Sequence, residues 1–184
     1  MKRVDTTLPG VFVIEPSVFR DERGFFFESY HEMKFAEVCI RDRFVQDNHS
    51  KSIKGTLRGL HYQITRPQAK LCRVIQGEVL DVAVDIRRGS PSFGQHTALR
   101  LSAENMKQVY IPAGFAHGYL VLSETAEFLY KCSDFYFPEY GRGVIWDDPV
   151  IAIPWGTETP ILSAKDCAHP MLSKITPGDL PGYE

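Results

Sequence analysis

The segment LRGLHYQITRPQAKLCRVIQGEVLDVAVD, from Leu57 to Asp85, decides the fold. Its apolar and polar residues alternate over three short runs, and alternation with a period of two is typical of a β-strand that buries one face. We therefore expect three consecutive strands, at residues 56–63, 70–75 and 78–85. They carry one histidine, one lysine and two aspartates, so the same segment also holds the candidate chemistry.

The dipeptide Gln76-Gly77 separates the second run from the third. Glycine supplies the positive φ that a two-residue turn needs, so we expect a tight hairpin here. In that register Cys72 lies opposite Asp81, and Lys70 shares one face with Asp81 and Asp85. The other face is mostly apolar and suited to packing against a second sheet; it carries Leu71, Arg73, Ile75, Leu80, Val82, Val84 and Ile86.

Short runs of this kind, separated by glycine and proline, continue along the chain. Many short strands with little helix favour an antiparallel sandwich or barrel. One short helix is expected from the capping box Ser29-Tyr30-His31-Glu32 to about Val38, and another after Ser163 as its N-cap. Further strands are expected at residues 11–14, 24–28, 44–50, 95–101, 107–111, 117–122 and 126–136.

The chain of 184 residues fits a single domain, residues 1–184, with a barrel core at about 44–137. Its net charge of −2 argues against nucleic acid or an anionic membrane as partner. No apolar run approaches the roughly 20 residues of a membrane span, and no signal peptide precedes Val11. The four cysteines are widely spaced, without Cys-x-x-Cys, which indicates core thiols in a reducing cytoplasm.

The histidine pattern argues against a metal centre. A metal-binding cupin is expected to carry His-x-His, but the position two residues after His61 is Gln63. The segment from Pro112 to His117 does match the second half of a cupin pattern, Pro-x-Gly-x-x-His. A single histidine from half a site is more often a structural residue than a ligand, so we expect no metal.

The side chains of His61, Lys70 and Tyr130 can all point into one concave interior, the first two from neighbouring strands. A lysine and two aspartates inside a barrel are costly unless they are paired or used. The structural alternative is a buried ion pair between Lys70 and Asp81 that fixes the hairpin. For Tyr130 the alternative is simple packing with its hydroxyl bonded.

Other residues and motifs give weaker or no indications of function. Arg23 and Arg58 could be solvated surface charges, and by strict alternation Arg58 faces away from His61 unless the strand bends at Gly59. In the strand at residues 44–50, Gln46, Asn48 and Ser50 point the same way. Dinucleotide-binding, Walker and serine-hydrolase motifs are all absent from the sequence, so it gives those functions no support.

Several long segments with specific residues are spread in order over nearly the whole chain. They are Arg23-Gly24-x-Phe26-x-Glu28, Gln46-Asp47-Asn48-His49-Ser50, Leu57-Arg58-Gly59-Leu60-His61-Tyr62-Gln63, Gln68-Ala69-Lys70-Leu71, Gly77-x-Val79-x-Asp81-Val82-Ala83-Val84-Asp85-x-Arg87, Pro112-x-Gly114-Phe115-Ala116-His117-Gly118, Leu129-Tyr130-Lys131 and Leu162-Ser163-x-Lys165-Asp166. Together these segments resemble the dTDP-4-dehydrorhamnose 3,5-epimerase family.

The resemblance implies a cupin-type jelly roll, a homodimer, and a reaction with neither metal nor organic cofactor. The implied substrate is dTDP-4-dehydro-6-deoxy-D-glucose, inverted at C3 and C5. His61 would be the base, oriented by Asp166, while Lys70 would stabilise the enolate oxygen at C4 and Tyr130 would return a proton from the opposite face. The residues implied to hold the sugar nucleotide are Arg23, Glu28, Gln46, Asn48, Arg58, His117 and Tyr136.

These residue types suit that chemistry. A hydrogen beside a ketone is far less acidic than an imidazolium, so a histidine removes it only if the developing oxyanion is stabilised. Two rivals remain open: a 3- or 5-epimerase of a related dTDP-ketosugar, and a non-catalytic sugar-binding cupin. A 3,4-ketoisomerase is a weaker third.

Overall fold

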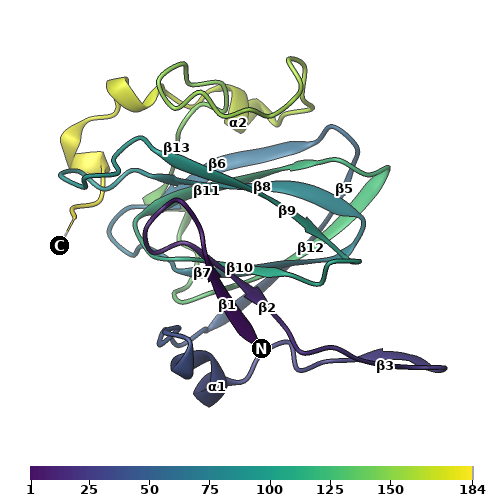
Figure 1. Ribbon diagram of the computed structural model, residues 1–184. Coiled ribbons are helices and arrows are strands. Elements are labelled where there is room, and N and C mark those ends of the chain that lie inside the picture. Colours follow the sequence, from purple (N-terminus) through teal and green to yellow (C-terminus); the bar gives the residue numbers. More distant parts are fainter. Residues whose placement is uncertain (184) are drawn as a thin grey trace.

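Two antiparallel sheets face each other in the computed structural model, which describes residues 1–183 (Figure 1). The six-stranded sheet has the order β1 (Lys2–Asp5), β2 (Phe12–Glu15), β10 (Gln108–Ile111), β7 (Lys70–Gln76), β12 (Thr125–Cys132) and β5 (Gln46–Ile53). The five-stranded sheet has the order β13 (Gly141–Gly143), β6 (Leu57–Gln63), β11 (Phe115–Val121), β8 (Glu78–Asp85) and β9 (His96–Ser102). The predicted β-sandwich is confirmed.

Each sheet buries alternate side chains in the space between them, and each is also covered on its outer face. The inner cluster includes Val74, Val79 and Phe128. A second cluster, around Val82 and Val84, lies between the five-stranded sheet and the C-terminal segment that runs across it in Figure 1. A third joins the six-stranded sheet to helix α1 (Glu32–Glu37). With both faces covered, the sheets hold their inner side chains in a rigid frame.

The hairpin predicted at Gln76-Gly77 is wrong. Strand β7 pairs with β10 and β12, whereas β8 pairs with β11 and β9, so the chain crosses from one sheet to the other at Gly77. Gly77 has φ +76°, and a Cβ there would lie 2.1 Å from the carbonyl oxygen of Thr125. The face expected to pack against the second sheet is also wrong: the opposite face does so, with Cys72 and Val74 on β7 and Val79 on β8, while Ile75 is exposed. The alternation could not distinguish a hairpin from a crossing, because both place Cys72 and Val79 on one side.

Both α-helices lie where the sequence predicts them, but only one has the predicted N-terminal capping residue. Helix α1 begins after His31, which makes no side-chain cap, so the capping box at Ser29 is not formed. Helix α2 (Ala164–Cys167) has Ser163 as N-cap, and its hydroxyl accepts a hydrogen bond from the Asp166 amide, as predicted. Three short 3-10 helices complete the described chain: η1 (Pro138–Tyr140), η2 (Leu172–Lys174) and η3 (Pro177–Asp179).

A separate hairpin of β3 (Phe19–Asp21) and β4 (Gly24–Phe26) projects from the side of the molecule that carries α1 (Figure 1). Three of its aromatic side chains are exposed: Phe19 by 68 %, Phe25 by 57 % and Phe26 by 71 %. Over residues 1–183, no helix has the length and apolarity needed to cross a membrane.

Candidate active site

A pocket of about 440 Å³ is lined by side chains from both sheets and from α2. Most residues implied by the resemblance line this one pocket: Gln46, Asn48, Arg58, His61, Lys70, His117, Tyr130, Tyr136 and Asp166. They come from strands β5, β6, β7, β11 and β12, from the loop after β12 and from helix α2. Residues far apart in sequence therefore share one cavity because the two sheets pack face to face.

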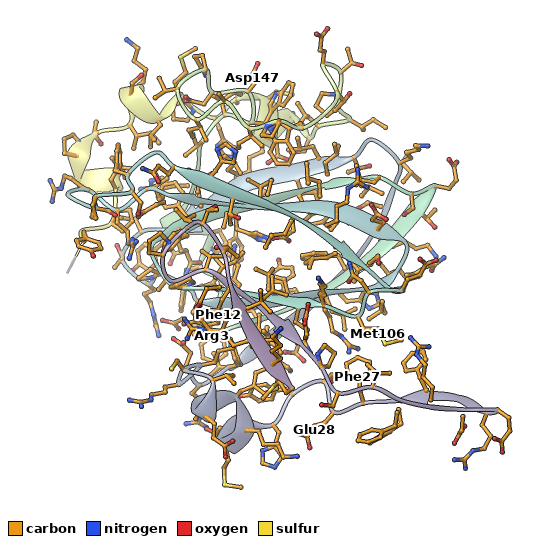
Figure 2. The ribbon with its side chains drawn as sticks, viewed as in Figure 1. Arg3, Phe12, Phe27, Glu28, Met106 and Asp147 are labelled. Atoms are coloured by element: carbon orange, nitrogen blue, oxygen red, sulfur yellow. The ribbon has the colours of Figure 1, made fainter. Side chains whose placement is uncertain are left out.

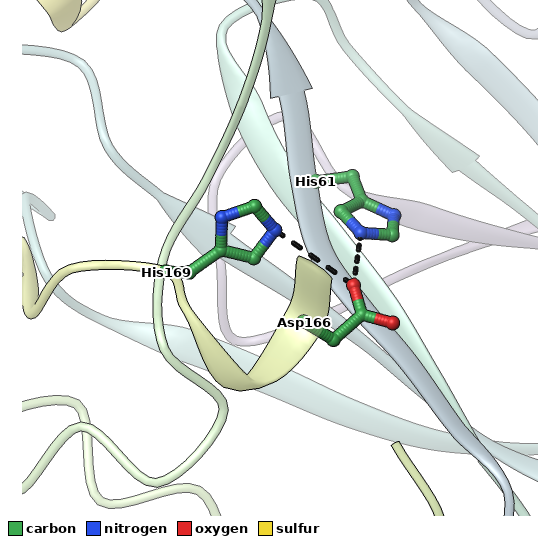
Figure 3. Close-up of side chains that lie close together, drawn as sticks. All are labelled: His61, Asp166 and His169. Carbon is green, nitrogen blue, oxygen red and sulfur yellow. Dashed lines mark hydrogen bonds and ion pairs between the residues drawn. The ribbon is translucent and has the colours of Figure 1, made fainter. Parts of the chain in front are cut away.

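His61 and Asp166 form the shortest polar contact in the pocket. Nε2 of His61 lies 2.5 Å from Oδ1 of Asp166 (Figure 3). The Ser163 hydroxyl donates to Oδ2 of the same carboxylate at 2.7 Å. Burial alone would raise the pKa of Asp166, but the hydrogen bonds from His61 and Ser163 outweigh it and lower the pKa. The ionised carboxylate fixes the imidazole with Nδ1 as its free nitrogen.

Arg58 lines the same pocket as His61, although strict alternation places it on the other face. The ladder between β6 and β11 pairs His61 with His117 but Arg58 with Tyr119, so β6 contains one extra residue at this point. Gly59, with φ +125°, lies in this bulge, and a Cβ there would be 2.6 Å from the Gly118 Cα. The bulge thus turns Arg58 to the side of His61, where its Nε donates to the Ser52 hydroxyl at 3.1 Å.

Lys70 lies in the sheet opposite His61, not on a neighbouring strand as predicted. The reason is that the chain also changes sheets between β6, which carries His61, and β7, which carries Lys70. The ion pair weighed for Lys70 and Asp81 is also not formed. Asp81 instead contacts His117, with Oδ2 2.9 Å from Nε2, and both side chains are buried. Burial lowers the pKa of His117, and the neighbouring carboxylate only partly opposes this. Within residues 1–183 Lys70 has no carboxylate partner.

Tyr130 stands beside Lys70 in the six-stranded sheet. The Lys70 Nζ lies 5.9 Å from the centre of the tyrosine ring. Burial is the main reason that the pKa of Tyr130 is raised. The pocket therefore has an imidazole on one sheet, and an ammonium and a protonated phenol on the other.

This geometry can be compared with known proteins. The family model that matches residues 5–174 is that of the dTDP-4-dehydrorhamnose 3,5-epimerases. The chain belongs to this family. Among its relatives, the 3,5-epimerase of Pseudomonas aeruginosa is 58 % identical over 168 residues, which cover 90 % of this chain and 93 % of the relative.

Two solved structures are informative. A 3,5-epimerase from Legionella pneumophila in complex with dTDP-4-keto-L-rhamnose is 50 % identical with a TM-score of 0.97, covering 100 % of this chain and 98 % of that one. A 3′-monoepimerase from Streptomyces bikiniensis in complex with dTDP-quinovose is 34 % identical with a TM-score of 0.90, covering 97 % of this chain and 92 % of that one. The epimerase fold is therefore compatible with epimerisation at one carbon or at two.

Two residues that the family resemblance implied for substrate binding lie outside the epimerase pocket. Arg23 is on the projecting hairpin, where it pairs with Asp21 at 2.5 Å. Glu28 pairs with Lys34 at 2.9 Å, on the same side of the molecule and far from the C-terminal segment around Asp147 (Figure 2). Within one chain, neither side chain reaches the pocket.

Sequence reasoning did not single out two residues near the epimerase pocket. Tyr119 follows His117 by two positions on β11 and bonds the Ser50 hydroxyl at 2.7 Å; the period of two could have indicated it. His169 follows Asp166 by three positions, a spacing that places two side chains on one face of a helical turn. Among residues 1–183, two groups of side chains have the composition of metal ligands: His61, Asp166 and His169, and Cys72, Asp81 and His117.

Proposed function

We propose that this epimerase inverts C3 and C5 of dTDP-4-dehydro-6-deoxy-D-glucose and forms dTDP-4-dehydro-L-rhamnose. One observation carries the proposal: the pair of His61 and Asp166 faces Lys70 and Tyr130 across a single pocket. A base on one side of a sugar ring and an acid on the other are what inversion beside a ketone requires. The names of the relatives agree with this reaction.

The first step is removal of the hydrogen beside the C4 ketone. Nδ1 of His61 accepts this proton, while Asp166, bonded to Nε2, stabilises the imidazolium that forms. The electron pair of the broken C–H bond moves to the C4 oxygen and generates an enolate. The Lys70 ammonium stabilises that oxygen, and its charge is available because no carboxylate within residues 1–183 pairs with it.

The second step is protonation from the opposite face. The Tyr130 hydroxyl gives its proton to the carbon, and its raised pKa keeps it in the protonated form until then. The remaining pocket residues hold the nucleotide and the sugar: Gln46, Asn48, Arg58, His117 and Tyr136. Since side chains supply both the base and the charge stabilisation, we propose that the reaction needs no metal and no organic cofactor.

We further propose that the protein acts as a homodimer. The exposed aromatic hairpin is an apolar surface of the kind that a second copy covers. It also carries Arg23, and Glu28 follows it, so docking on a partner would bring both near that partner's pocket. A cytoplasmic location fits the four free cysteines, Cys39, Cys72, Cys132 and Cys167.

Hydrogen exchange tests the reaction directly. The protein is incubated in heavy water with dTDP-4-dehydro-6-deoxyglucose, and NMR or mass spectrometry locates the incorporated deuterium. We expect deuterium at both C3 and C5. Deuterium at one carbon only would indicate a single-site epimerase, as in the Streptomyces relative, and no deuterium would indicate a binding protein.

A further inference from the structure

Three potential metal ligands meet where α2 packs beside β6. We propose that His61, Asp166 and His169 bind a divalent transition-metal ion, best Zn²⁺ or Co²⁺, and that the bound ion blocks the base of the epimerase. The binding site rests on this side-chain cluster alone. Its effect on catalysis rests on the function proposed above, and the two parts can be tested separately.

The distances suit a metal after small side-chain movements. The three ligand atoms lie within 4.8 Å of one another, with the Asp166 Oδ1 2.5 Å from the His61 Nε2 and 3.7 Å from the His169 Nε2 (Figure 3). Bonds of about 2.0–2.2 Å to a tetrahedral ion place ligand atoms roughly 3.3 Å apart. The contact of Asp166 with His61 must therefore open and its contact with His169 must close, each by less than about 1 Å. The two histidine nitrogens, which lie within 4.8 Å of each other, must approach by at most about 1.5 Å.

His169 is the residue that points to a ligand. Its side chain is only 10 % exposed, and its Nε2 is buried without a hydrogen-bond partner among residues 1–183. A buried ring nitrogen without a partner is costly, and most such atoms in proteins are bonded. The His169 ring fits here only because residue 143 is a glycine: a Cβ on Gly143 would lie 2.3 Å from that same Nε2. A metal ion would give this nitrogen the partner it lacks.

The cluster is accessible and its ligands select the type of ion. The His61 side chain is 41 % exposed on the pocket side, so an ion can enter from the pocket and keep a water as fourth ligand. Two imidazole nitrogens and one carboxylate oxygen favour Zn²⁺, Co²⁺ or Ni²⁺ over Mg²⁺ or Ca²⁺.

Binding would inactivate the base without any redox change. The ion takes the lone pair of the His61 Nε2, and the proton formerly directed from Nε2 to Asp166 moves to Nδ1. A neutral imidazole protonated at Nδ1 has no free nitrogen for the substrate hydrogen. Zn²⁺ is therefore expected to inhibit the reaction, and removal of the ion by a chelator is expected to restore it.

Cobalt absorption tests binding independently of activity. The protein is titrated with Co²⁺, and we expect the visible bands of a tetrahedral site, which Zn²⁺ then displaces. In His169→Gln the apparent Co²⁺ affinity should fall at least about tenfold. Even the loss of a residue that only hydrogen-bonds a metal ligand typically lowers metal affinity by about 10–100-fold. The matched control is His96→Gln on β9, outside the pocket, which should bind as the unmodified protein does.

Activity provides the second readout. His169→Gln should keep the deuterium exchange rate of the unmodified protein and should lose inhibition by Zn²⁺. If His169→Gln does not fold, His61→Asn tests the same ligand set by Co²⁺ absorption. Unchanged Co²⁺ affinity in the folded ligand variant would overturn the proposal. So would a sulfur-to-cobalt band that disappears in Cys72→Ser, because that band places the ion in the other cluster. A protein that binds Co²⁺ but shows no exchange would instead refute the proposed function.

Discussion

At the scale of single residues, His61 depends on a partner that is 105 positions away in the sequence. Asp166 is buried beneath it and bonded on its other oxygen by Ser163, so the carboxylate cannot turn away. On the proposed roles, His61 removes the proton at both carbons.

We predict that His61→Ala abolishes deuterium exchange at C3 and at C5. The substitution removes the imidazole, whose general-base contribution is typically 10²–10⁴-fold. Exchange is followed by NMR, and circular dichroism checks that the sheets remain folded. Exchange at the normal rate in a folded variant would remove His61 from the role of base.

We predict that Tyr130→Phe slows net inversion more than it slows loss of the first hydrogen. The ring and its packing remain, but the proton for the opposite face is missing. Loss of the first hydrogen is measured from a substrate deuterated at the reacting carbon, and inversion from the product. Equal slowing of both steps would indicate that Tyr130 only positions the sugar.

The sequence predicted residues of the pocket but not all of their partners. His61, Lys70, Tyr130 and Asp166 were predicted from their motifs, and all four line the pocket. The pairing of Asp81 with His117 could not, because it depends on the ladder between β8 and β11, which joins positions 36 residues apart. His169 was missed because it lies just beyond the end of α2, so its three-residue spacing from Asp166 becomes informative only once the helical turn is known.

At the scale of elements, the bulge in β6 decides what faces the pocket. Alternation along β6 predicts Arg58 on the outer face, and a single extra residue at Gly59 reverses this. A bulge depends on the partner strand, here the close approach of Gly118, so the strand's own pattern does not reveal it. The same limit explains the crossing at Gly77.

We predict that Gly59→Ala lowers the free energy of unfolding by about 3 kcal/mol or more, through backbone strain and overpacking together. The new Cβ would meet the backbone of Gly118 and would displace Arg58 and His61. Urea denaturation measures the loss. Gly55→Ala is the control: it also has positive φ but no neighbouring atom, so strain of about 1–2 kcal/mol is its full cost. Similar losses in both variants would contradict the role of the close approach.

A buried carboxylate at the end of β8 gives the fold a dependence on pH. Burial by itself would raise the pKa of Asp85, but hydrogen bonds from Arg87, Ser90 and Ser92 outweigh it and lower the pKa to about 2. In the unfolded chain the carboxyl has its ordinary pKa of about 3.9. The stabilisation is therefore complete above about pH 4 and is lost as the pH falls towards 2.

We predict that this carboxylate contributes about 3 kcal/mol near neutral pH, from a pKa difference of about two units. Asp85→Asn should therefore be less stable than the unmodified protein above pH 4, and the difference should shrink steadily towards pH 2. Denaturation at a series of pH values measures it. A difference that does not change with pH would show that the contribution is not electrostatic.

At the scale of the whole molecule, Arg23 and Glu28 form ion pairs within one chain but do not line its pocket. Their hairpin projects from the body with its aromatic side chains exposed. A single sequence cannot reveal whether such residues act on another copy, as proposed here, since alternation reports only burial within the chain.

We predict that replacing Phe25 and Phe26 by serine converts the proposed dimer to a monomer and lowers the exchange rate. Both effects follow if the hairpin packs on a partner and delivers Arg23 to its pocket. Sedimentation measures the mass and NMR the exchange. The control is Val150→Ser, which is equally exposed at 73 % but lies in the C-terminal segment. A double variant that keeps the mass of the unmodified protein would contradict the interface.

The crossing at Gly77 has a stereochemical consequence. It separates β7, which pairs with β12, from β8, which is joined to β6 through β11. The proposed base on β6 and the proposed acid on β12 therefore lie in different layers. A planar enolate held between the layers loses hydrogen toward one and regains it from the other. The configuration of the product then follows from the placement of base and acid on opposite sheets. An enzyme that preserved the configuration would need both groups on the same sheet.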